Sequence, residues 1–70
     1  MSNKEEQMQK IYDELILCID NLQKKNLINA LGSYGKESIP RLQYFYDLEI
    51  DYDIKNYIMD IIVRINRGLI

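Results

Sequence analysis

A stripe of isoleucines at helical spacing is the feature that most constrains the fold of this chain. Five residues form the stripe: Ile54, Ile58, Ile61, Ile62 and Ile65. Steps of four and three residues return to the same face of an α-helix. Isoleucine is a weak helix former, so such a helix depends on packing of its apolar face. We predict a packed helix over residues 52–67, capped by Asp51 or Asp53 and stopped by Gly68.

The N-terminal third of the chain predicts a long helix over residues 3–23. Its apolar residues recur at spacings of four and three: Met8, Tyr12, Leu15, Ile19 and Leu22. Ser2 and Glu5 form a capping-box pattern at its start. Cys18, the single cysteine, lies in the same run. We interpret it as a small buried hydrophobe, because a lone cysteine can form no intramolecular disulfide.

Two shorter helices are predicted in the middle of the chain, over residues 24–31 and 37–48. We expect Gly32 to end the first of them in the left-handed conformation, with Gly35 repeating the break. Pro40 lies in the first turn of the second, where its missing N–H costs least.

These segments predict an all-α fold in which residues 1–70 form a single compact four-helix domain of two antiparallel hairpins. The segments Tyr44-Phe45-Tyr46 and Ile61-Ile62-Val63 have the composition of strands. The helical period extends through both of them, however, and this argues against a β-sheet. A chain of 70 residues buries only about 60% of the surface that its unfolded form exposes, so its core is small.

The central part of the chain also resembles a known helical repeat. The resemblance rests on Ala30-Leu31-Gly32, Ile39-Pro40-Arg41-Leu42, Asp47 and the segment from Asp51 to Lys55. This order is similar to the short HEAT-like repeats of bacterial proteins, in which a helix with an early proline turns back through an acidic loop. The resemblance implies a binding surface and no chemistry. Solenoids of this kind normally need about three repeats, and this chain has length for two, so we expect some apolar surface to stay exposed.

Catalytic and ligand-binding motifs are not supported by the sequence. Histidine is absent, which removes the commonest general base and metal ligand. The stretch from Gly32 to Ser38 has two residues between its glycines, where a phosphate-binding loop has four. Counted from Asp51, the fifth and sixth positions of a calcium loop would be Lys55 and Asn56, which do not fit it. We therefore expect no enzymatic activity, no cofactor and no metal site.

An acidic, tyrosine-rich segment is the best candidate for a binding surface. Between Leu42 and Ile54 the chain has four acids and no base. The predicted partner-binding residues are Tyr44, Asp47, Glu49, Asp51, Tyr52, Asp53 and Tyr57. Tyrosine is favoured at binding hot spots, and carboxylates attract Arg or Lys on a partner. The alternative interpretation is a solvated interhelical loop whose acids cap a helix, with Phe45 and Tyr46 in the core.

The sequence thus predicts a non-enzymatic protein–protein interaction module that binds a basic protein surface. Its expected role is that of a small inhibitor, immunity or anti-defence protein or regulatory adaptor, with a nuclease or nucleic-acid-binding protein as a candidate partner. The abundance of Ile, Asn, Lys and Tyr suggests an AT-rich genome, such as that of a low-GC bacterium or of one of its phages or mobile elements. A cytoplasmic location is expected, because no apolar run is long enough for a membrane span or a signal peptide.

Two alternatives remain open at this stage. One is a homodimeric structural module. The other is a nucleic-acid-binding regulator, which the net charge of −2 and the scattered basic residues disfavour.

Overall fold

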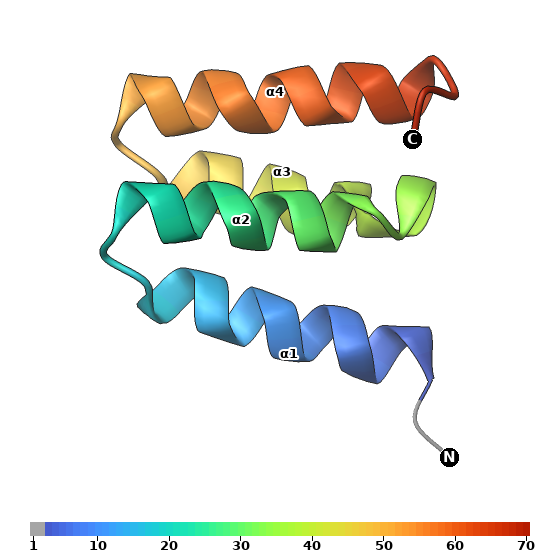
Figure 1. Cartoon of the computed structure of the whole chain (residues 1–70), viewed down its shortest axis with the longest axis horizontal. Helices are drawn as coiled ribbons and strands as arrows, with labels where there is room; N and C mark the ends of the chain where they lie inside the picture. The colour runs from blue at the N-terminus through green and yellow to red at the C-terminus, as the bar shows by residue number, and fades with distance from the viewer. Residues whose placement is uncertain (1–2) are drawn as a thin grey trace.

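The computed structural model describes residues 3–70, which contain helices and no strand. The elements in chain order are α1 (Lys4–Leu17), α2 (Asn21–Gly32), the short 3₁₀ turn η1 (Gly35–Ser38), α3 (Ile39–Leu48) and α4 (Tyr52–Asn66). Successive helices run in opposite directions, so α1 is parallel to α3 and α2 is parallel to α4 (Figure 1). The predicted all-α class with four helices is confirmed. Within the described residues, no helix is long and apolar enough to cross a bilayer.

Helix α2 lies at the centre of the arrangement. It packs against α1 on one side and α4 on the other, and α3 lies behind α2 and packs mainly on α4 (Figure 1). The α1–α2 turn, residues 18–20, and the α3–α4 turn, residues 49–51, lie at the same end of the bundle, which is the left end in Figure 1. The N-terminal start of α1, the turn η1 and the C-terminus lie at the other end. Helix α1 therefore has one main packing partner, whereas each of the other helices has at least two.

Apolar residues from all four helices form the core. Its fully or nearly fully buried apolar residues are Met8, Leu15, Leu27, Ile28, Leu31, Leu42, Phe45, Ile54, Ile58, Ile61, Ile62 and Ile65. All five isoleucines of the α4 stripe belong to this set, so that prediction is confirmed. Pro40 lies in the first turn of α3, and Asp51 caps α4 through the N–H of Asp53, as expected.

The prediction of one helix over residues 3–23 is wrong in its C-terminal part. Helix α1 ends at Leu17, and Asp20 starts α2 by accepting a hydrogen bond from the N–H of Gln23 at 2.9 Å. An aspartate side chain can compete with helix continuation by bonding to the backbone locally, and it favours a new N-cap. As a result Ile19 and Leu22, predicted to face the core, lie on the surface. Cys18 is half-buried in the turn.

Gly32 has a different role from the predicted one. It belongs to α2, and the left-handed glycines among residues 3–70 are Gly35 and Gly68, with φ of 74° and 75°. A Cβ atom on Gly32 would lie only 2.7 Å from Cγ2 of Ile61. The glycine therefore permits the close approach of α2 and α4. At the start of the chain the N-cap of α1 is Asn3, and the predicted Ser2 capping box falls outside the described residues.

Candidate protein-binding surface

Most of the acidic residues predicted to bind a partner are used inside the molecule. They form a series of polar contacts along the parallel helices α2 and α4, which we call the α2–α4 ladder. Its pairs are Asn21–Asp51 at 3.0 Å, Lys24–Glu49 at 2.8 Å, Lys25–Asp53 at 2.9 Å and Asn29–Tyr57 at 2.6 Å. The ladder runs from Asn21 to Asn29 on α2, and its partners run from Glu49, in the turn before α4, to Tyr57 in α4. It therefore joins the two hairpins along about two turns of α2.

Glu49 is the most buried member of the ladder. It is only 8% exposed, and besides Lys24 it accepts hydrogen bonds from the N–H groups of Ile50 and Asp51. Burial raises the pKa of Glu49, but the bonds from Lys24 and from these two N–H groups outweigh burial and hold the pKa below its ordinary value. Glu49 is thus a structural carboxylate, and we leave it out of the proposed binding surface.

The other ladder members are closer to solvent. The side-chain bond from Asn21, followed by the N–H of Asp53, lowers the pKa of Asp51. Hydrogen bonding to Asp53, and then the charge of that carboxylate, raises the pKa of Lys25. The Lys25 ammonium also lies 5.5 Å from the ring centroid of Tyr57, within cation–π range. Four of the seven predicted partner-binding residues therefore contact α2 instead: Glu49, Asp51, Asp53 and Tyr57.

The remaining three predicted residues, Tyr44, Asp47 and Tyr52, are exposed. Tyr44 and Asp47 line a shallow depression on α3 together with Pro40 and Gln43. Tyr44 also lies near Tyr12 of α1. Burial raises the pKa of Tyr12, and the neighbouring Tyr44 raises it further. The structure thus separates Tyr44 and Asp47, on the outer side of α3, from Tyr52 at the start of α4.

The two turns at one end of the bundle repeat the same sequence and conformation. Leu17-Cys18-Ile19-Asp20 and Leu48-Glu49-Ile50-Asp51 share the pattern Leu-x-Ile-Asp. The second residue of each turn has nearly the same φ and ψ, −79° and 135° in the first and −82° and 138° in the second. The aspartates likewise match, with −86° and 122° against −80° and 118°. Each turn therefore ends one helix, presents an isoleucine and caps the next helix.

The repeated turns create an exposed apolar surface. Ile19 is 93% exposed and Ile50 is 91% exposed. Four more large apolar side chains close to them in sequence are also exposed. We call the whole set the end surface: Leu17, Ile19, Leu22, Leu48, Ile50 and Tyr52. Sequence reasoning missed this surface because it placed Ile19 and Leu22 in a continuous helix. Comparison of the chain with itself would have found the repeated Leu-x-Ile-Asp.

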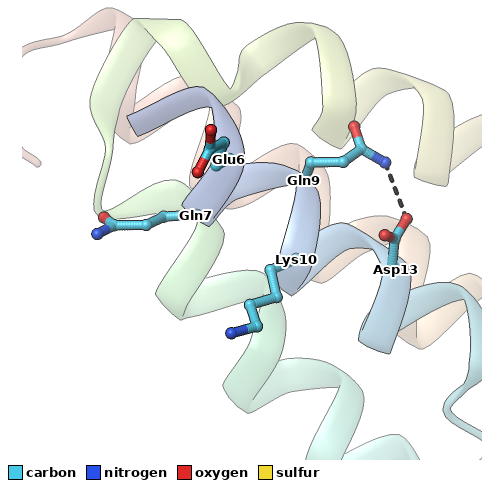
Figure 2. Close-up of a pocket in the computed structure, with 5 residues that line it drawn as sticks. All are labelled: Glu6, Gln7, Gln9, Lys10 and Asp13. Carbon is cyan, nitrogen blue, oxygen red and sulfur yellow. Dashed lines mark hydrogen bonds between the residues drawn. The ribbon is translucent and has the colours of Figure 1, made fainter. Parts of the chain in front are cut away.

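The depressions on the surface do not resemble ligand sites. One runs along α1 and is lined by Glu6, Gln7, Gln9, Lys10 and Asp13 (Figure 2). The lining residues come from one helix and are exposed, and Gln9 donates a hydrogen bond to Asp13 at 2.8 Å. A single helix cannot enclose a small molecule, whereas ligand pockets bury most of their ligand. Residues 3–70 also contain no group of three or more His, Cys, Asp or Glu placed to hold a metal ion.

Comparison with known proteins finds no matching family model, no significantly similar curated protein and no significantly similar solved structure.

Proposed function

We propose that this protein is a non-enzymatic, cytoplasmic protein-binding module that acts as a small inhibitor, immunity or anti-defence protein or regulatory adaptor. The observation that carries the proposal is the end surface. Two equivalent isoleucines, Ile19 and Ile50, are almost completely exposed to water. Exposed apolar area is unfavourable, and a bound partner would cover it.

The size of the end surface suits a protein partner. Burying one Leu or Ile side chain is worth about 1.5–3 kcal/mol at roughly 25 cal/mol per Å², which corresponds to about 100 Å² per side chain. The five Leu and Ile residues of the end surface, together with Tyr52, therefore offer on the order of 500 Å². A standard interface buries about 800 Å² on each partner, of which about 60% is apolar. The end surface therefore supplies the apolar part of one ordinary interface.

Charge favours a basic partner over a second copy of the chain. Within residues 3–70, Asp20, Asp47 and Asp51 form no ion pair. The lysines nearest the end surface bind groups inside the molecule. Lys24 and Lys25 belong to the α2–α4 ladder. Lys55 donates to the carbonyl oxygens at the end of α3, those of Tyr46 and Glu49, at 2.9 and 3.1 Å. Carboxylates around an apolar centre attract Arg and Lys and oppose a like-charged surface.

Photo-crosslinking tests the proposal. A photoreactive amino acid at Tyr52 in the full chain, irradiated in a lysate of the native host, should give one discrete adduct with a basic protein. The adduct should disappear in the variant Ile19→Asp/Ile50→Asp and persist in the control Met59→Asp/Val63→Asp, which alters two exposed residues of α4. Adducts insensitive to the end-surface variant would overturn the proposal. An adduct with a second copy of the chain would instead support the homodimeric alternative.

The nucleic-acid-binding alternative predicts a different result. Binding to generic duplex DNA would weaken steeply as salt rises, because each phosphate contact releases counterions. Saturable DNA binding at low salt, with no protein adduct from Tyr52, would favour that alternative.

A further inference from the structure

Helices α1 and α3 run parallel, and two of the residue pairs that link them are 32 positions apart. Arg41 donates from Nε and Nη2 to Oε1 of Gln9 at 3.3 and 3.2 Å, which joins positions 32 apart. Tyr12 and Tyr44, also 32 apart, are close enough for one to affect the other electrostatically. One helical turn further along are Ile16 on α1 and Leu48 on α3. Ile16 follows Tyr12 on α1 and Leu48 follows Tyr44 on α3, each by about one helical turn. We call these two stripes, Tyr12–Ile16 and Tyr44–Leu48, the α1–α3 seam.

The α1–α3 seam lacks a covering helix. Helix α1 packs mainly on α2, whereas α3 packs on both α2 and α4. Ile16 is 46% exposed, and Tyr44 and Leu48 are more exposed still. Leu48 belongs to both the seam and the end surface, so the apolar area of the seam continues into that of the end surface.

The charged residues beside the seam form ion pairs near η1 and, among residues 3–70, none toward the interhelical turns. Near η1, the Arg41 guanidinium is bound to Glu5 at 3.0 Å and to Gln9, so its positive charge is already paired. Asp13 and Asp47 are exposed and are the sequence neighbours of the seam residues Tyr12 and Leu48. Neither carboxylate takes part in an ion pair among the described residues. The open part of the seam is therefore apolar at its centre and acidic at both edges.

We infer that the α1–α3 seam seats an amphipathic, basic helix of the partner protein. This inference rests on the proposed function and adds the form of the bound segment. Two stripes at helical spacing form ridges, and a ridge of a third helix can pack between them. Apolar residues at positions i, i+4 and i+7 of that helix would cover Ile16, Tyr44 and Leu48. Its Lys or Arg residues would then lie over Asp13 and Asp47, and affinity would fall as salt screens these pairs.

A displayed peptide library tests the inference with the full chain as target. The peptides have about 18 residues, roughly 27 Å as a helix, with a helix-favouring framework and randomised positions along one face and its borders. Selection should enrich Leu, Ile or Met at i, i+4 and i+7, with Lys or Arg beside them. Binding of an enriched peptide, measured by fluorescence anisotropy, should weaken roughly tenfold or more in Ile16→Asp and in Leu48→Asp.

The control is Val63→Asp on α4, where the valine is 40% exposed against 46% for Ile16. It should change the affinity less than twofold, and circular dichroism should show all variants folded. An absence of enriched helical peptides, or peptides insensitive to Ile16→Asp, overturns the inference. If Ile19→Asp/Ile50→Asp removes the partner adduct at Tyr52 and Ile16→Asp does not, the proposed function stands. The inference that a partner helix binds in the seam is then wrong. Dimerisation abolished by Ile16→Asp would assign the seam to a second copy and also overturn the inference.

Discussion

Lys24 and Glu49 join the two helical hairpins through a buried ion pair, with Nζ and Oε2 2.8 Å apart and both side chains largely removed from solvent. Lys24 comes from the first turn of α2, and Glu49 from the turn between α3 and α4. The same carboxylate accepts two backbone N–H groups of that turn. One side chain therefore fixes both the turn and its position on α2, and its removal should loosen both.

Replacing Glu49 with alanine should lower the free energy of unfolding by about 2–4 kcal/mol, because Lys24 and two N–H groups lose their acceptor in a buried place. Glu49→Gln keeps an acceptor oxygen and should cost about half as much. Urea denaturation followed by circular dichroism measures both. Glu14→Ala, at an exposed position, should stay within about 0.5 kcal/mol of the parent. An equally small effect at Glu49 would show that the ion pair does not hold the hairpins together.

Acid should destabilise the fold through Glu49 and Asp51, whose folded-state pKa values lie below their ordinary ones. The stability from a lowered carboxyl pKa is complete above the unfolded value, about 4.3 for Glu and 3.9 for Asp. It is lost as pH falls from there through the folded value. Unfolding free energies between pH 7 and pH 2.5 should therefore drop below about pH 4.5. Glu49→Gln should flatten this decrease, and an unchanged pH profile would contradict the assignment.

Gly32→Ala should destabilise the protein by about 1 kcal/mol. The new methyl gains up to about 1 kcal/mol of helix propensity, but its overlap with the buried Cγ2 of Ile61 should cost more, in the range of about 1–3 kcal/mol. In an Ile61→Ala background the overlap is gone, so the same substitution should become stabilising. The sign change, measured by thermal or urea unfolding, is the test. A stabilising Gly32→Ala in the parent would mean that α2 and α4 can move apart easily.

The two capping aspartates should differ in their effect on stability. Asp20→Ala removes the acceptor for Gln23 and should cost about 1 kcal/mol. Asp51→Ala removes an equivalent cap and also the bond from Asn21, so it should cost more. The conservative variants Asp20→Asn and Asp51→Asn should recover most of each loss, because asparagine is an equally good cap. Equal costs for the two alanine variants would show that the Asn21–Asp51 contact adds nothing.

Surface isoleucines should be separable from core isoleucines by mutation. Ile19→Ser and Ile50→Ser should each change the free energy of unfolding by less than about 0.5 kcal/mol, since both side chains are already in water. Ile58→Ala, at a fully buried position, should cost about 2–5 kcal/mol. A large loss at Ile19 would instead favour the continuous helix over residues 3–23 that its spacing suggests.

Local sequence signals predicted much of the fold. The α4 stripe, the early Pro40, the break at Gly35, the stop at Gly68 and the cap at Asp51 were all predicted, because each depends on interactions within a few residues. The left-handed conformation was predicted at Gly32, whereas Gly35 and Gly68 adopt it. The predicted end of the third helix, at residue 48, also agrees with the structure. The break at residues 18–20 was missed, although Asp20 is a good N-cap, because the apolar spacing continued across it.

Whether a side chain faces the core, a ladder or solvent was decided by the tertiary structure. Ile19 and Ile58 are the same residue type at helical spacing, yet one lies in a turn and the other is fully buried. Glu49 and Asp47 are neighbours in an acidic segment, but only Glu49 meets a lysine of α2. The sequence by itself determined where helices form, since helix period and capping are local. Packing of distant helices determined which acids are internal and which apolar residues remain available to a partner.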